Sequence, residues 1–425
     1  MHPIVRIAGI AVVFIITTLA WFVLGGIMME RTSSQTRKLE GRVADLWGNE
    51  QIQRAPTFTR RWTTPEEQVS TEMVDGQQKT VRKQVNVPQQ EEMSPSSSDI
   101  DVDLKLDQRL KGLMWYALYD VGFKGRWVYT HERPERTDLH LGFDFPNAMG
   151  LYDDFRFVVD GKDMARTLRP NNGQLSTMVP VEPGQEVVLE VSYKSRGMDN
   201  WRYEPAQGVA NLEDFSLAMT TDFDKIDFPP YTMSPSSRSR TEGGWALGWD
   251  FKQVVTGHKI GMTMPQRIQP GELASQLAFS APISLFFFFL VLFVLGTLKN
   301  IDIHPINYLM LGGSFFAFHL LFSYSVDHLE VVLAFALSSV VSVVLVVSYL
   351  HLVVSARFAF VEAAAAQIVY LIGFSLAYFW DGFTGLTVTV LSILTLFLIM
   401  QLTGRIRWSD VLSRRPTADA PPAAS

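Results

Sequence analysis

The sequence predicts an α-helical polytopic membrane protein with six spans in a 1+5 arrangement and one large inserted domain that is mainly β. Three observations predict this fold class: an uncharged apolar segment near the start of the chain, five further apolar segments packed almost end to end near its finish, and a long polar region between them with the periodicity of strands. We therefore expect residues 31–275 to form a sandwich-like domain outside the cytoplasm.

The first predicted span runs from Ile7 to Met29 without a charged residue. This length meets the roughly 20 apolar residues that a helix needs to cross the hydrocarbon core of a bilayer. A cleavable signal peptide has a shorter apolar region followed by a small-x-small site. Because Gly25–Met29 leads directly into charged residues, we predict an uncleaved anchor over residues 1–30.

Five further spans are predicted in the C-terminal third, each close to the thickness of a bilayer. The turns between them are too short to fold by themselves, so residues 276–404 are expected to form one five-helix bundle. Residues 405–425 form a basic, proline-rich tail. The predicted spans are Phe279 to Leu298, Ile306 to Tyr324, Val331 to Val354, Val361 to Trp380 and Phe383 to Leu402.

Lysine and arginine residues predict the orientation, because loops rich in them remain in the cytoplasm. They fall on one side of the predicted spans, whereas the opposite short turns carry Asp327, Glu330 and Asp381. Both termini are therefore expected in the cytoplasm and residues 31–275 on the other side of the membrane. The basic residues that set this orientation are Arg6, Lys299, Arg357, Arg405, Arg407, Arg414 and Arg415.

The composition argues against several classes of function. A net charge of −6 gives no indication of a nucleic-acid partner. The chain contains no cysteine, which removes disulfides, thiol chemistry and cysteine-based zinc sites. The motifs of serine hydrolases, phosphate-binding loops, zinc proteases and dinucleotide-binding folds are absent. We therefore expect a protein that is not an enzyme and has no catalytic residues, metal site or cofactor.

Alternation of apolar and polar residues predicts strands in the inserted domain. Over residues 100–107, aliphatic side chains alternate with aspartate and lysine, which gives one apolar and one charged face. The same pattern occurs over 139–145, 155–160, 186–193 and 245–251, with turn residues between these segments. Strands joined by such turns predict an antiparallel sandwich or a related β architecture.

Three further segments of the inserted domain have local signals. Asp75-Gly76 separates two polar runs rich in β-branched residues, over 68–74 and 77–87, and predicts a protruding hairpin. Residues 88–99 contain prolines and serines and are predicted to be a loop. Residues 32–47 have helical spacing and are expected to continue the first span beyond the membrane.

Several segments resemble the CreD family of bacterial inner-membrane proteins. Residues 43–51 resemble the start of that family, and residues 110–119 and 240–249 are similar to later segments in the same order. The most specific likeness lies in His304–Gly312 and His319–His328, and residues 404–408 close the pattern. Residues 126–235 contribute little to this resemblance. The family usually shows Gly-Pro where Ala55-Pro56 stands and an acidic residue where Arg407 stands.

The resemblance implies a multi-pass protein of the bacterial inner membrane that is linked to envelope integrity or a stress response. It also implies that residues 31–275 are periplasmic. The family supplies no catalytic residue. Its motifs and the polar residues near the spans give these candidates: His304, Pro305, Tyr308, His319, Tyr324, Asp327, His328, Arg357, Glu362, Arg405 and Trp408.

The polar residues near the spans have two interpretations. An ionisable residue within a bilayer is costly and therefore indicates function, and only His319 and His351 are predicted deep enough to need a partner for proton relay or ligand binding. The alternative is that polar residues cap helix ends or extend to the headgroups. We favour this structural role for two clusters, Asp327 with His328 and Glu330, and Arg357 with Glu362.

Aromatic residues of the inserted domain are candidates for a ligand-binding platform, although most tryptophans of a sandwich belong to its core. Trp201, Arg202 and Tyr203 lie in a turn-rich segment and are the first candidates for such a surface. The main hypothesis is a non-enzymatic envelope protein whose β domain binds an envelope glycan, a lipid or a periplasmic protein. The alternative is a transporter or lipid-handling protein with a polar cavity among its spans, and membrane-embedded hydrolysis ranks last.

Overall fold

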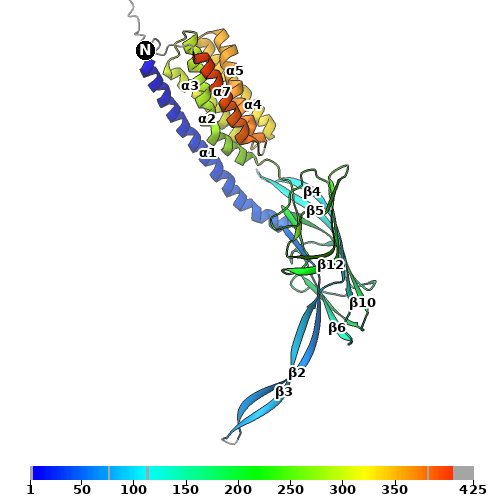
Figure 1. Ribbon diagram of the computed structural model, residues 1–425. Coiled ribbons are helices and arrows are strands. Elements are labelled where there is room, and N and C mark those ends of the chain that lie inside the picture. The colour runs from blue at the N-terminus through cyan, green and yellow to red at the C-terminus, as the bar shows by residue number, and fades with distance from the viewer. Residues whose placement is uncertain (1–2, 75–76, 112–113, 381, 405–425) are drawn as a thin grey trace, which may run out of the picture. The chain divides into compact units, whose positions relative to one another are not determined.

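The computed structural model describes residues 3–74, 77–111, 114–380 and 382–404, so the predicted tail over 405–425 lies outside the described residues. The chain divides into two compact units. The helical unit comprises Met1–Lys38, Gly112–Met114 and Ile268–Ser425, and the β domain comprises Leu39–Lys111 and Trp115–Arg267. These divisions lie near the boundaries predicted after residues 30 and 275 (Figure 1).

Six helices among the described residues are long and apolar enough to cross a membrane, which confirms the predicted 1+5 arrangement. The helix α1 runs without interruption over Pro3–Trp47, so the predicted extension of the first span is also confirmed. The others are α2 (Pro270–Leu298), α3 (Pro305–Ser325), α4 (Val331–Val353), a fifth span over Phe358–Phe379, and α7 (Thr384–Thr403).

The fifth span is not a uniform α-helix. Its segments are η1 (Phe358–Ala363), α5 (Ala364–Gln367), η2 (Ile368–Gly373), α6 (Phe374–Leu376) and η3 (Ala377–Phe379), of which η1 and η2 are π-helical. The fully buried Gln367 lies between the two π-helical segments and donates a hydrogen bond of 2.8 Å to Ser342 of α4. The irregular backbone therefore coincides with a polar contact inside the bundle.

Small residues bring α1 close to α3. A Cβ at Gly9 would lie 2.8 Å from the Pro305 side chain, and one at Gly312 would lie 3.0 Å from Thr17. On the same side of α1, the ring of Trp21 meets Phe316 at a centroid distance of 5.5 Å. Such close approach is how helices associate in a lipid environment, where burial of apolar surface gives no advantage over contact with lipid.

The described residues of the β domain form three sheets. Their orders are β1-β11-β15, β13-β14-β12-β4-β5-β10-β7-β8 and β3-β2-β6-β9. Their strands are β1 (Gln51–Arg54), β2 (Thr57–Val74), β3 (Gln77–Met93), β4 (Ser97–Lys111), β5 (Met114–Thr130), β6 (Thr137–Asp144), β7 (Asp153–Val159), β8 (Lys162–Asp163), β9 (Gln174–Val181), β10 (Glu186–Met198), β11 (Asn200–Glu204), β12 (Ala210–Thr221), β13 (Ser237–Arg240), β14 (Trp245–Thr256) and β15 (Ile260–Thr263).

Aromatic rings show that the large sheet packs against the two smaller ones. Phe123 of β5 lies 6.4 Å, between ring centroids, from Tyr203 of β11, and Tyr129 of β5 lies 5.8 Å from Phe58 of β2. The predicted sandwich-like domain is confirmed, but two of its sheets contain parallel pairs, and only the sheet β3-β2-β6-β9 is purely antiparallel in the described residues. The register pairs β12 with β4 and β1 with β11 in parallel.

The predicted hairpin is present as β2 and β3, which pair continuously from Phe58 with Met93 to Val74 with Gln77. Within the described residues only Thr57–Arg60 of β2 also pairs with β6, so residues 61–74 and 77–90 form a two-stranded arm that extends away from the sheets (Figure 1). The predicted loop over 88–99 is wrong, because β3 continues to Met93 and β4 begins at Ser97. An edge strand tolerates Pro88 since its missing N–H leaves no buried partner unpaired.

Candidate functional site

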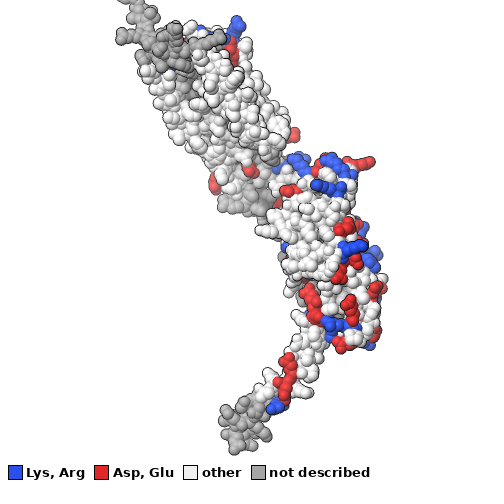
Figure 2. Space-filling view, in the orientation of Figure 1, with Lys and Arg blue, Asp and Glu red and all other residues white. Residues whose placement is uncertain are grey.

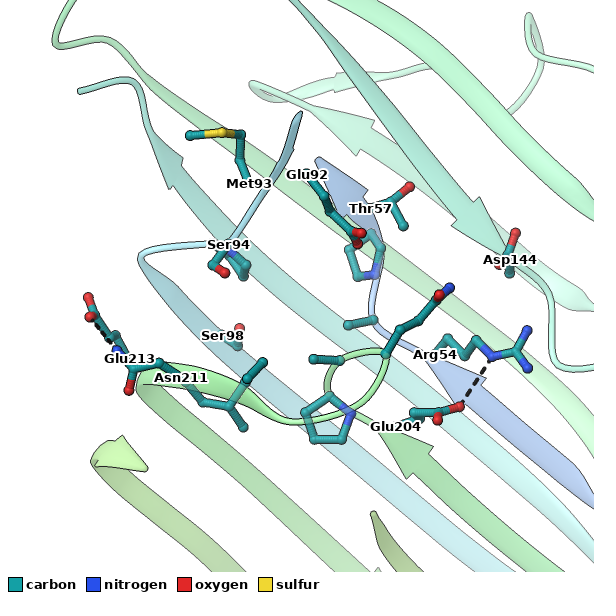
Figure 3. Close-up of a pocket in the computed structure, with 18 residues that line it drawn as sticks. Arg54, Thr57, Glu92, Met93, Ser94, Ser98, Asp144, Glu204, Asn211 and Glu213 are labelled. Carbon is teal, nitrogen blue, oxygen red and sulfur yellow. Dashed lines mark hydrogen bonds and ion pairs between the residues drawn. The ribbon is translucent and has the colours of Figure 1, made fainter. Parts of the chain in front are cut away.

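A pocket of about 230 Å³ lies where the arm joins the β domain. We call it the arm-base pocket. The ends of β1, β3, β6 and β11 and the start of β2, β4 and β12 bring residues from all three sheets to its lining (Figure 3). The lining residues are far apart in the sequence, since the first is Arg54 and the last is Glu213. Only the sheet topology assembles them.

Gln53, fully buried, fixes the backbone beside the pocket. Its amide nitrogen donates to the carbonyl oxygens of Arg54 at 2.7 Å and Asp144 at 3.2 Å, and its amide oxygen accepts from the Tyr193 hydroxyl at 2.6 Å. Burial raises the pKa of Tyr193 well above its ordinary value, so this hydroxyl remains a donor. Three strands are therefore joined at one side of the pocket, which favours a preformed shape.

Charged side chains surround the pocket on several sides. Arg54 and Glu204 form an ion pair with a nitrogen–oxygen distance of 3.2 Å, and Lys259 approaches the other carboxylate oxygen of Glu204 at 3.5 Å. In the view of Figure 3 this pair lies at one end of the pocket, and Asn211 with Glu213 lies at the other. The segment Ala55-Pro56, where the sequence departs from the CreD pattern, is also part of the lining.

The predicted platform at Trp201, Arg202 and Tyr203 is wrong as an exposed surface. Both rings have 0% exposure, and they point into the core from β11. Arg202 points the other way and forms an ion pair with Glu50 at 2.7 Å. The alternation of apolar and polar residues over 200–204 indicates that Trp201 and Tyr203 face the core. The same alternation places the pocket residue Glu204 on the polar face of β11.

Three of the candidates in the His304–Gly312 motif have structural roles in the helical unit. His304 caps α3, because its Nδ1 accepts a hydrogen bond of 3.2 Å from the Ile306 amide. Pro305 occupies the first turn, where its missing N–H costs nothing. Tyr308 is fully buried, with its ring edge against Phe289 at a centroid distance of 5.1 Å.

Asp327 connects the α3–α4 turn to α1. Its carboxylate accepts a hydrogen bond of 2.5 Å from Arg31, and the Arg31 guanidinium lies 5.8 Å from the centre of the Tyr324 ring. His328 and Glu330 are exposed and take no part in this contact. The motif residues Tyr324 and Asp327 therefore hold the first span against the bundle.

Breaking this contact is expected to destabilise the protein. Arg31→Gln and Asp327→Asn should each lower the free energy of unfolding by about 1–2 kcal/mol, since each removes a charged hydrogen bond from a partly buried pair. The double variant should lose little more than either single one. Unfolding midpoints in lipid nanodiscs would measure this, with Glu330→Gln as a control. Additive losses would contradict a direct coupling.

The remaining membrane candidates do not form one site. Glu362 forms an ion pair with Lys299, whereas Arg357 is exposed. His351 is exposed on α4, where its ring lies 5.9 Å from that of Phe360. Arg405 and Trp408 lie outside the described residues.

His319 is the one deep histidine of α3, with 2% exposure. Its Nδ1 lies 3.0 Å from the Phe315 carbonyl oxygen, and its ring meets Trp21 at 5.7 Å. The adjoining pocket, lined also by Ser284 and Ser375, has a volume of about 10 Å³. This space is about the size of one water molecule, so it is too small for a transported solute.

Figure 2 shows both signs of charge over the β domain and an almost uncharged surface along the helices. A family model described as "Inner membrane protein CreD" matches residues 280–409. The bundle is therefore CreD-like. This match contains both motifs, His304–Gly312 and His319–His328, and it confirms the resemblance over the last five spans. The β domain with its arm-base pocket lies outside the matched CreD segment.

Comparison with solved structures found a likeness to a proposed nutrient-binding protein from Legionella pneumophila. The two are 10% identical, with a TM-score of 0.30, over 46% of this chain and 74% of that chain. This likeness is too low to carry an argument about the function of the protein. No curated protein matches the chain.

Proposed function

We propose that the protein is a non-enzymatic binding protein of the inner membrane that supports envelope integrity or a stress response. In this proposal the β domain is periplasmic, both termini are cytoplasmic, and the arm-base pocket holds a small polar ligand derived from the envelope. The six helices anchor the domain in the lipid bilayer. The basic residues on one side of the spans support this orientation.

The observation that carries the proposal is the difference between the two units. The β domain has a polar-lined pocket of about 230 Å³ on a rigid base, whereas the pocket beside His319 measures about 10 Å³. Binding sites in proteins are concave and largely preformed, with a few positioned polar groups. Several polar side chains of the bundle pair with one another, as the Gln367 amide nitrogen does with Ser342 and the Tyr349 hydroxyl does with Asn307.

A blocking variant tests the proposal. Ala206 lines the pocket from the loop after β11, and Ala206→Trp would fill much of the space. The full-length protein in nanodiscs would be dialysed against small fragments from enzymatically digested bacterial cell wall, and bound fragments identified by mass spectrometry. We expect fragments on the parent protein and at least tenfold less on Ala206→Trp.

Ala148→Trp is the matched control, because Ala148 is an exposed alanine in a different loop of the same domain. It should bind fragments as the parent protein does. Retention of no fragment by the parent, or equal retention by both tryptophan variants, would contradict binding at this pocket.

Lipid handling is the second candidate function, and one observation favours it. An apolar groove of about 290 Å³ lies between α1 and α2, with Ala11, Phe14 and Phe289 among its walls. Its volume and lining suit part of an acyl chain. If the groove were the functional site, Ala11→Trp would abolish the protein's effect on the envelope in cells while Ala206→Trp would leave it unchanged.

A further inference from the structure

The chain passes between the two units at the turn that joins β4 to β5 and again after β15. Lys111 and Trp115 of the β domain flank Gly112–Met114, which belong to the helical unit. Arg267 is the last residue of the β domain and lies three residues before α2, a candidate membrane span. An extended residue covers at most about 3.6 Å, so roughly 11 Å of chain joins Arg267 to that span. Covalent connection alone therefore keeps Arg267 close to the lipid headgroups.

These two segments carry aromatic, aliphatic and basic side chains. The Arg267 guanidinium lies 4.2 Å from the centre of the Trp115 ring, and its Nε donates a hydrogen bond of 2.8 Å to the Gln108 side chain. Leu110, near the end of β4, is 54% exposed. Tryptophan rings and the stems of basic side chains favour the interface between a bilayer and water, because one part of each is apolar and the other polar.

The basic charge of these segments is not neutralised by neighbouring acids. Asp107 is the acid nearest to Lys111 in the sequence, and Arg109 holds it with a nitrogen–oxygen distance of 2.8 Å. Among the residues that the structure describes, no carboxylate forms an ion pair with Lys111 or Arg267. The bond to Gln108 uses one of the five donors of the Arg267 guanidinium. We call Leu110, Lys111, Trp115 and Arg267 the juxtamembrane patch.

We propose that the juxtamembrane patch binds the anionic headgroups of phospholipids in the leaflet that faces the β domain. Lys111 and Arg267 supply the positive charge, and an arginine can hold a phosphate through two parallel N–H bonds. Leu110 supplies apolar contact beside the Trp115 ring. The short connection to α2 keeps lipid within reach at a high effective concentration, which favours a lipid surface over a soluble partner. This site is separate from the arm-base pocket and does not depend on its ligand.

A single introduced thiol tests the contact, because the chain contains no cysteine. Leu110→Cys would carry an environment-sensitive fluorophore in the full-length protein in nanodiscs, with a phospholipid that bears a nitroxide on its headgroup as the quencher. Val255→Cys is the matched control, since Val255 is 68% exposed. It lies at the opposite end of the large sheet, because β14 runs antiparallel to β12 and β12 runs parallel to β4. We expect quenching at position 110 and little at position 255.

The charge of the lipid decides between specific binding and mere proximity. Nanodiscs of phosphatidylcholine with and without phosphatidylglycerol would be compared. Quenching at position 110 should rise about twofold or more with phosphatidylglycerol, because each basic side chain near an anionic surface favours binding about fivefold. The rise should disappear at high salt, which screens exposed charges.

Charge-removing variants locate the site. Lys111→Gln combined with Arg267→Gln should abolish the rise with phosphatidylglycerol. The matched control is Lys162→Gln with Arg169→Gln, because both residues are exposed bases elsewhere in the β domain, and it should keep the rise. Lys111→Arg with Arg267→Lys preserves the charge and should also keep it, which separates lost charge from a disturbed fold.

Three results would overturn the inference. The first is equal quenching at positions 110 and 255. The second is equal quenching at position 110 with and without phosphatidylglycerol, which would show that the patch is near the membrane and does not recognise its charge. The third is an equal loss in the two charge-removing variants.

Discussion

Replacement of Trp201 by alanine is expected to lower the free energy of unfolding by about 3–5 kcal/mol, because it removes a large, fully buried ring. The ring belongs to the aromatic core between the sheets, where it lies 6.5 Å from Phe123. A ligand platform would give the opposite pattern, with normal stability and lost binding. Thermal unfolding of the full chain, with hydrogen exchange to follow the β domain, distinguishes these results.

The adjacent Arg202 provides the control for this substitution. Its side chain forms a partly buried ion pair with Glu50, so Arg202→Ala should cost about 1–2 kcal/mol, less than the loss expected for Trp201→Ala. Faster exchange in β11 and β5 is expected for Trp201→Ala only. If both variants unfold at the same temperature as the parent protein, the core assignment of Trp201 is wrong.

Gly244→Ala is expected to destabilise the β domain by about 1–3 kcal/mol or more, through overpacking against backbone atoms. A Cβ at Gly244 would lie 2.2 Å from the Thr221 carbonyl oxygen and 2.8 Å from the Phe223 amide nitrogen. Backbone atoms cannot move away as a flexible side chain can. The ends of β12 and β14 would therefore have to separate, which hydrogen exchange in these strands would detect.

Gly243 offers a closely matched control, since a Cβ there would meet no atom within 4 Å. Gly243→Ala should change the unfolding midpoint little. Both glycines lie in the short segment between β13 and β14, so the comparison also shows which glycine the fold requires. Equal unfolding midpoints for the two variants would show that the close contact between position 244 and Thr221 does not determine the stability of the β domain.

The structural evidence weakens the transporter hypothesis at the residues on which it depended. His319 is enclosed by Trp21, Phe318 and the neighbouring helices, and its pocket has room for about one water molecule. Asp327 forms an ion pair with Arg31 and Glu362 forms one with Lys299, so both carboxylates have structural partners outside the two predicted clusters. The apolar groove beside Ala11 leaves lipid handling as the alternative with support.

The sequence by itself determined the elements with strong local patterns. The six spans follow from apolar length, because a bilayer requires it, and β4 follows from strict alternation over residues 100–107. The extension of α1 to Trp47 and the pairing of β2 with β3 likewise had local signals. Residues 88–93 were assigned wrongly because proline normally ends a strand, whereas pairing in the arm accommodates it.

Only the tertiary structure decided which residues meet. Trp201 was a surface candidate by its local sequence, but the register of β11 turns it into the core. The arm-base pocket brings together Arg54, Glu92, Ser98 and Asp144 from four strands, and no spacing in the sequence indicates this. The physical reason is that a span or a strand reports its own periodicity, whereas a pocket depends on how distant strands pair across sheets.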